Sequence, residues 1–270
     1  SLLFNAEHPD ANDPLHKWGV DDGWGYIDKE GHEHRFIAYY TWKLWRQVRG
    51  ALSSLANAYL YTGDPVYAHK AGVMLDRIAD LYPDMDWALY GERGWFHSDG
   101  GSRRGKIEGR IWETGVILTL ARWYDMMAEG LDDCPELLEF LTKKAEQYDL
   151  PGAKGTVEDL YGNIEENILR CGAEAIMSER IHGNGGSHES AMAQLAMAYG
   201  RDPEMTEWLD WIFAADGGYI PATIVGAIDR DGVGSEGAPS YSLGWARAIG
   251  RLTDMLAEFE PYDKHDIYRD

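Results

Sequence analysis

The stretch Arg180-Ile-His-Gly-Asn-Gly-Gly-Ser-His-Glu-Ser-Ala-Met-Ala-Gln-Leu-Ala-Met-Ala-Tyr199 carries a glycine-rich loop directly into a helix. Apolar residues of its second half recur at the spacing of one helix face, and Ser187 suits the N-cap position. The loop glycines allow positive φ values and close backbone approach to a ligand, while a helix N-terminus favours bound negative charge. The stretch therefore predicts either a binding site for an anionic substrate or a plain turn between two helices.

Helical periodicity continues along most of the chain, and β-patterned segments are almost absent. Helix pairs joined by alternating short and long loops predict an all-α fold. Because no sequence repeat of fixed period is visible, a closed ring of helical hairpins fits better than a solenoid. The predicted helices cover about residues 36–61, 67–82, 112–127, 138–148, 157–175, 187–199, 204–212 and 242–259.

The chain is expected to have three regions. Residues 1–35 are polar and rich in turns, and they predict a segment that wraps the outside of the fold. Residues 36–262 form the helical domain, and residues 263–270 would begin a linker. Within the helical domain, residues 84–106 predict a loop long enough to be functional. We expect residues around 90–106 to line a cavity together with the loops around 181–188 and 230–241.

Composition excludes several classes of partner. A formal net charge of −21 argues against binding to nucleic acid or an anionic membrane, and no apolar run reaches the length of a membrane span.

The two cysteines, Cys134 and Cys171, match no metal or redox motif, although one disulfide is possible. His32-Glu-His34 lacks the HExxH spacing and reads as a surface turn. A cluster of basic residues could still attract an acidic polymer locally, or be a solvated loop: Arg103, Arg104, Lys106 and Arg110.

Five stretches together resemble the α/α toroid domain of the heparinase II/III-like polysaccharide lyases. They are His8-Pro-Asp-Ala-Asn-Asp-Pro14, Asp21-Asp-Gly-Trp-Gly-Tyr26, Gly105-Lys-Ile107 with Trp112-Glu113, Gly183-Asn-Gly-Gly-Ser-His188, and Asp231-Gly-Val-Gly-Ser-Glu-Gly-Ala-Pro-Ser-Tyr241. The resemblance spans nearly the whole chain. It implies an incomplete (α/α) toroid of antiparallel helical hairpins in a periplasmic or secreted enzyme that cleaves 4-linked uronic acids by β-elimination.

The same resemblance implies a C-terminal β-sandwich that is absent from this sequence. In relatives that domain can supply a further catalytic histidine and often a structural divalent metal. No cofactor is expected within these 270 residues. The expected partner is an anionic polysaccharide, and the sequence leaves the oligomeric state open.

β-Elimination at a uronate needs a group that neutralises the C6 carboxylate, a base at C5 and an acid at the leaving O4. The resemblance implies that Asn184 donates to the carboxylate and that His188 is the base or a second neutralising group. It also implies that Tyr241 protonates O4 and can serve as the base. An ordinary histidine titrates near 6 to 7, so activity would vary over that range. A second set of residues is expected to contact or orient the substrate: Arg103, Arg104, Arg180, Glu189 and Glu236.

Other interpretations stay open at this point. Without the resemblance, His188 is an ordinary capping histidine and Tyr241 a core tyrosine. A glycoside hydrolase on a similar helical barrel would use two carboxylates, such as Glu189 and Asp231, as acid and base. A third possibility is a non-catalytic toroid that only binds glycans.

Overall fold

The computed structural model describes residues 8, 10–14, 16, 26–34, 45–92, 99–235 and 237–265. The chain divides into two compact units, Ser1–Ser54 and Leu55–Asp270, and the division falls inside helix α1 (Trp45–Thr62). The predicted boundary between residues 35 and 36 lies outside the described residues, as do most of the predicted wrapping segment and the end of the predicted linker.

The described part of the first unit contains a two-stranded antiparallel ribbon. Strands β1 (Tyr26–Ile27) and β2 (Glu33–His34) pair with Tyr26 opposite His34. The Asp28 carboxylate accepts hydrogen bonds from the backbone N–H groups of Glu30 and His32, which closes the turn. Side-chain capture of nearby N–H groups is a common way to stabilise such a turn. Residues 30–32 are exposed, but only His32 of the predicted surface turn His32-Glu-His34 lies in this turn, because Glu33 and His34 form β2.

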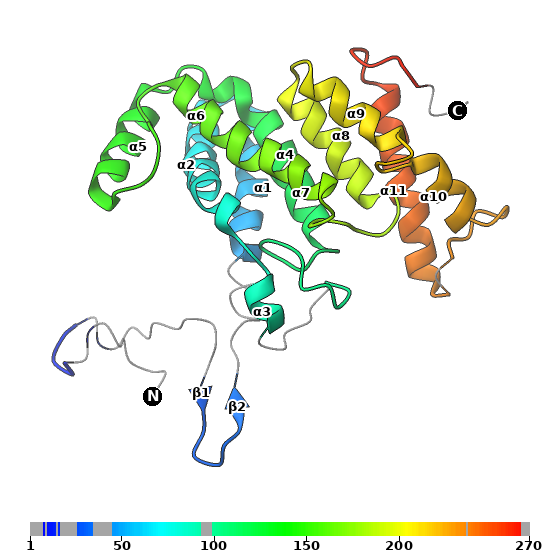
Figure 1. The fold of residues 1–270 in the computed structure, drawn as a ribbon. Helices are drawn as coiled ribbons and strands as arrows, with labels where there is room; N and C mark the ends of the chain where they lie inside the picture. Colours follow the sequence, from blue (N-terminus) through cyan, green and yellow to red (C-terminus); the bar gives the residue numbers. More distant parts are fainter. Residues whose placement is uncertain are drawn as a thin grey trace. The chain divides into compact units, whose positions relative to one another are not determined.

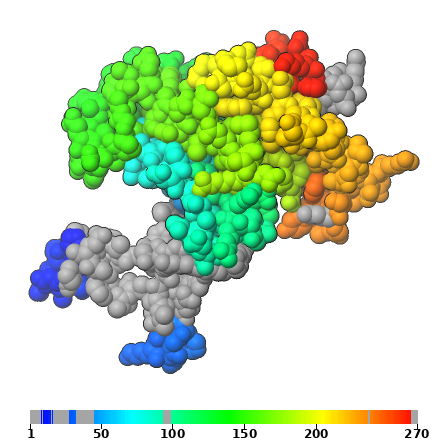
Figure 2. All heavy atoms as spheres, in the orientation of Figure 1, coloured from blue at the N-terminus to red at the C-terminus, as the bar shows by residue number. Residues whose placement is uncertain are grey.

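The second unit is helical, and its helices form a continuous packed body (Figures 1 and 2). This confirms the all-α prediction for the described residues, whose only strands are the two in the ribbon above. After α1, the helices are α2 (Pro65–Leu81), α3 (Ala88–Glu92), α4 (Glu113–Met127), α5 (Pro135–Tyr148), α6 (Val157–Ile164), α7 (Cys171–Met177), α8 (Ser187–Tyr199), α9 (Glu204–Phe213), α10 (Ile220–Ala227) and α11 (Pro239–Ala257).

The structure differs from the sequence prediction at four places. The predicted helix 157–175 is a helical run in which the π-helical turn Glu165–Arg170 joins α6 to α7. Helix α3 lies inside the stretch predicted to be a loop, and α10 was not predicted at all. Both cysteines are free thiols, so they do not form the disulfide that the sequence allowed.

Helix α8 is the centre of the second unit. It packs against α4, α7, α9 and α11, and Figure 1 shows it lying between α4 and α7 on one side and α9 and α11 on the other. Small side chains let these neighbours approach closely, and nearly every face of the helix is buried. The predicted N-cap, Ser187, is the first helical residue. The N-cap is Gly186, whose φ of +84° is unfavourable for other residues.

The loop that precedes α4 is held by a buried carboxyl. Glu113 accepts hydrogen bonds from the Tyr82 hydroxyl (3.1 Å) and from the backbone N–H of Glu108 (2.6 Å). Lys106 is also buried and donates to the backbone carbonyls of Pro83 and Met85. These contacts fix the segment that carries Arg110. Among the described residues, no helix has both the length and the apolar character needed to cross a membrane.

Candidate functional site

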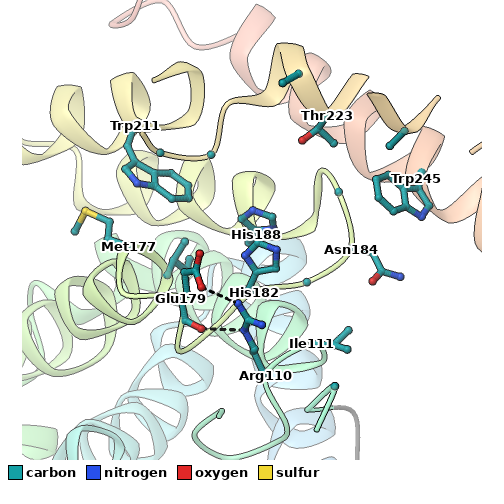
Figure 3. Close-up of a pocket in the computed structure, with 18 of the residues that line it drawn as sticks. Arg110, Ile111, Met177, Glu179, His182, Asn184, His188, Trp211, Thr223 and Trp245 are labelled. Atoms are coloured by element: carbon teal, nitrogen blue, oxygen red, sulfur yellow. Dashed lines mark hydrogen bonds and ion pairs between the residues drawn. The ribbon is translucent and has the colours of Figure 1, made fainter. Parts of the chain in front are cut away.

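A cavity of about 470 Å³ opens at the N-terminal end of α8 within the second unit (Figure 3). Its wall is built from the loop before α4, the loop between α7 and α8, the turn after α9, and helices α10 and α11. A volume of this size is typical of small-ligand sites. Its polar and aromatic lining includes Arg110, Glu179, His182, Asn184, His188, Trp211, Asp216, Thr223 and Trp245.

Two histidine rings stack inside this cavity. The centroids of His182 and His188 lie 4.1 Å apart with an angle of 26° between the ring planes, and the rings of His188 and Trp211 meet edge to face. Burial lowers the pKa of both rings, and that of His188 falls to about 3. Both imidazoles are therefore neutral at pH 7. The expected titration of His188 near 6 to 7 is wrong, because the ring is buried beneath His182 rather than exposed to solvent.

Glu189 lies behind His188 and is fully buried. Its Oε2 atom lies 3.2 Å from Nδ1 of His188, but an N–H of that ring is not aligned to donate to it. Burial raises the pKa of Glu189 to about 7, although the nearby backbone N–H groups of Glu189 and Gly186 oppose the rise. The carboxyl group is thus substantially protonated at neutral pH.

Arg110 supplies the positive charge of the cavity. Its Nε donates to the backbone carbonyl of Glu179 (2.9 Å), and its Nη2 lies 3.2 Å from the Glu179 carboxylate. The backbone carbonyl of Arg110 in turn accepts from the N–H of His182 (3.2 Å), which ties the loop before α4 to the glycine-rich loop. The guanidinium keeps further N–H donors beyond these two bonds.

Trp211 of α9 and Trp245 of α11 stand on opposite sides of the histidine stack (Figure 3). Glycine makes room for the second ring, because a Cβ atom at Gly185 would collide with the six-membered ring of Trp245. The two indoles therefore flank a polar floor. Such an arrangement suits a sugar ring, which offers apolar faces to aromatic side chains and hydroxyl groups to polar ones.

The structure brings together only part of the predicted site. Asn184 and His188 line the cavity, whereas Tyr241 in the first turn of α11 is 58% exposed and is not among the lining residues. The described residues of the 230–241 loop also contribute none of the lining, so that part of the cavity prediction is wrong. Asp231 lies in an exposed turn of this loop, away from Glu189 in the core. Glu236 lies outside the described residues.

The basic residues that were predicted to contact the substrate instead make hydrogen bonds, an ion pair and packing contacts with neighbouring segments. Arg180 donates to the carbonyls of Met85 (2.8 Å) and Gly105 (3.3 Å). Arg104 shares the Glu179 carboxylate with Arg110, and the side chain of Arg103 packs against Gly91. None of Arg103, Arg104 and Arg180 is among the residues that line the cavity.

Several lining residues were not singled out from the sequence. His182 had one usable signal, since it lies two residues before Asn184 in the same glycine-rich loop. Arg110 appeared only as a member of the basic cluster. Trp211, Trp245 and Glu179 carry no local signal, because their place in the cavity depends on how distant helices pack.

No protein-family model matches the chain, and searches of curated proteins and of solved structures likewise give no match. Function is therefore inferred from the residues of the cavity and from the motifs of the sequence.

Proposed function

We propose that this chain is a polysaccharide lyase that cleaves a 4-linked uronic-acid polysaccharide by β-elimination in the cavity at the start of α8. The observation that carries the proposal is the neutral His182–His188 stack, set beside Asn184 and Arg110. It places a proton acceptor next to two groups able to bind a carboxylate. The motifs that resemble the heparinase II/III-like lyases favour the same reaction.

Substrate binding would use the two indoles and the two carboxylate partners. Trp211 and Trp245 stack on the sugar rings that flank the bond to be cleaved. The Asn184 amide and the remaining N–H donors of Arg110 bind the C6 carboxylate of the uronate. Withdrawing negative charge from that carboxylate acidifies H5, because the electron density released at C5 moves onto the carboxylate in the transition state.

His182 is the better placed base of the two histidines. It is half-buried and forms the accessible side of the stack, whereas His188 is buried. In the proposed reaction, His182 takes H5, the C5 electron pair forms the C4–C5 double bond, and the C4–O4 bond breaks. His182 then returns its proton to O4. Tyr241, the acid implied by the resemblance, is not needed in this scheme because it lies outside the cavity lining.

The resemblance to the lyases also leads us to propose a particular fold, location and partner for the protein. The helical hairpins of the second unit would belong to an incomplete (α/α) toroid, and the protein would be secreted or periplasmic. Its partner would be an anionic polysaccharide. A following β-sandwich, with any structural metal, would belong to the same enzyme.

A screen of uronate polysaccharides for new ultraviolet absorbance tests the proposal. The C4–C5 double bond conjugated to the carboxylate absorbs, so a lyase increases absorbance from an intact polymer. His182→Gln serves as the matched inactive variant. Loss of absorbance from unsaturated oligosaccharides would instead identify a hydrolase, and saturable binding of a polymer without any product would identify a glycan-binding module.

A further inference from the structure

The carboxylate of Asp216 differs from the other acidic groups of the cavity. Glu179 is paired with Arg110, and Asp99 accepts hydrogen bonds from two backbone N–H groups of its own turn. Asp216 lines the same cavity and is exposed, and its side chain has no hydrogen bond or ion pair with any residue that the structure describes. It is therefore an uncompensated negative charge in the wall of the cavity.

The charges of the cavity limit how many anionic groups a bound molecule can bring. Arg110 is the only cationic side chain among the lining residues that the structure describes, and Glu179 already shares its guanidinium. The remaining N–H donors of Arg110, together with Asn184, suit one carboxylate. A second anionic group would lie beside acidic side chains, which repel it.

Asp216 and Asn184 lie on opposite sides of the cavity. Gly217, directly after Asp216, is so close to the Trp211 indole that a Cβ atom there would be 2.9 Å from Cδ1 and 3.0 Å from Nε1. The residue directly after Asn184 packs against the ring of Trp245, and Figure 3 shows Asn184 on that side of the histidine stack. The free carboxylate therefore belongs to the Trp211 side, and the amide belongs to the Trp245 side.

We propose that Asp216 and Trp211 form a subsite for a neutral, unsulfated sugar, so that the substrate is a polysaccharide in which such a sugar is linked to O4 of the uronate. The indole stacks on an apolar face of this sugar, and the carboxylate accepts hydrogen bonds from its hydroxyl groups. The uronate then lies on the Trp245 side, where Asn184 contacts its carboxylate. This inference rests on the proposed function.

The same arrangement makes Asp216 a specificity-determining residue without a part in proton transfer. Burial, Arg110 and Glu179 shift the pKa of His182, and Asp216 is not among the causes. Its charge therefore acts on the neighbouring sugar, away from the reacting group. A polyuronate, or a polymer with a sulfate on that sugar, would place a second negative charge against Asp216.

Two pairs of polysaccharides test the subsite. Chondroitin and chondroitin 6-sulfate both link N-acetylgalactosamine to O4 of a uronate and differ by the sulfate on that sugar, and heparosan and its N-sulfated form make a second pair. Calorimetry on oligosaccharides of equal length in His182→Gln measures binding without cleavage. We expect the unsulfated member to bind about tenfold more tightly at low salt, and this preference to shrink in about 0.5 M NaCl.

Two further substitutions in this background separate the local charge from the net charge of −21. Asp216→Asn keeps the shape of the side chain and removes its charge, so it should strengthen binding of the sulfated member and reduce the preference to within about threefold. Glu158→Gln removes an exposed charge on α6 and should leave the preference unchanged. Circular dichroism checks that the variants fold. Tighter binding of the sulfated member, or an unchanged preference in Asp216→Asn, would overturn the inference.

Absorbance assays on the wild type distinguish this inference from the proposed function. Cleavage of both members of a pair with equal kcat/KM would overturn the subsite and leave the lyase in place. Preferential binding of the unsulfated member without any cleavage would overturn the lyase and leave the subsite. Binding of neither pair would overturn the subsite, and the wider screen of uronate polysaccharides would still test the lyase.

Discussion

The imidazole rings of His182 and His188 are stacked, with centroids 4.1 Å apart and ring planes 26° from parallel. Two protonated rings at this distance would repel each other, so at most one of them can carry a charge. His188 is the more buried of the two and has a pKa of about 3. The stack therefore leaves His182 as the ring that can exchange a proton with a bound molecule.

Single substitutions test whether the catalytic group is His182, as the cavity indicates, or Tyr241, as the resemblance implies. We expect His182→Gln to lower kcat by a hundredfold or more, at the low end of about 10²–10⁴ for general acid–base catalysis. Tyr241→Phe should keep most of the activity, since this exposed ring lies outside the cavity lining. Initial rates on one uronate polymer check both. The opposite ranking would restore Tyr241 as the catalytic group.

The pH dependence of kcat/KM should identify the base. His182 must be neutral to accept a proton, so activity falls as pH drops through its pKa, which burial and Arg110 hold below the usual range. The negative charge of Glu179 acts in the opposite direction and raises the pKa of His182. Glu179→Gln should therefore shift the acid limb to lower pH, while its amide oxygen can still accept from Arg110. Glu158→Gln removes an exposed charge on α6 and should leave the profile unchanged. A shift to higher pH in Glu179→Gln would contradict the assignment.

The two indoles should contribute to substrate binding more than to the chemical step. Trp211→Ala and Trp245→Ala should each raise KM by about tenfold, the equivalent of roughly 1.4 kcal/mol, with a smaller change in kcat. Tyr61→Ala is the control, because this ring is 86% exposed and lies outside the cavity lining. Unchanged KM values in both tryptophan variants would show that sugar rings do not stack there.

Buried Glu113 should make stability depend on pH. Burial raises its pKa from 4.5 to about 7, so the folded state binds more protons than the unfolded state in this range. Its contribution to stability is complete below pH of about 4.5 and declines as pH rises to 7, by at most about 3 kcal/mol. Gln at this position stays neutral, and the Tyr82 hydroxyl can reverse its hydrogen bond to accept from the amide.

Urea unfolding of wild type and Glu113→Gln at several pH values checks this prediction. The difference in unfolding free energy should move in favour of the variant as pH rises from 4.5 to above 7. Glu189 and His188 also titrate, but they are present in both proteins and cancel in the difference. A difference that does not change with pH would mean that Glu113 titrates normally.

Most of the helices could be predicted because they are long and amphipathic, with clear ends. Helix α8 is bounded by Gly186 and Gly200, both of which adopt positive φ. Helix α10 was missed because Pro221 and the β-branched residues Thr223 to Val225 favour other structures. Its proline falls in the first turn, where the missing N–H does no harm. Helix α3 is only five residues long, too short for a periodic signal.

The candidate site was predictable only where its residues are neighbours in sequence. Asn184 in the glycine-rich loop and His188 in the first turn of α8 are close neighbours in sequence, and both line the cavity. Trp211 and Trp245 come from two helices far apart in the chain, so nothing local marks them as partners. The burial of the His188 ring beneath His182 could not be predicted from the sequence either, because it depends on how separate elements pack.

The most direct test of the central claim is the mass of the products released from one uronate polysaccharide. β-Elimination adds no water, so the fragment with the new non-reducing end should be lighter by one water than a hydrolytic product and should carry a C4–C5 double bond. His182→Gln should release neither fragment at a comparable rate. Products that have gained water, or unsaturated products formed equally fast by His182→Gln, would contradict elimination by this cavity.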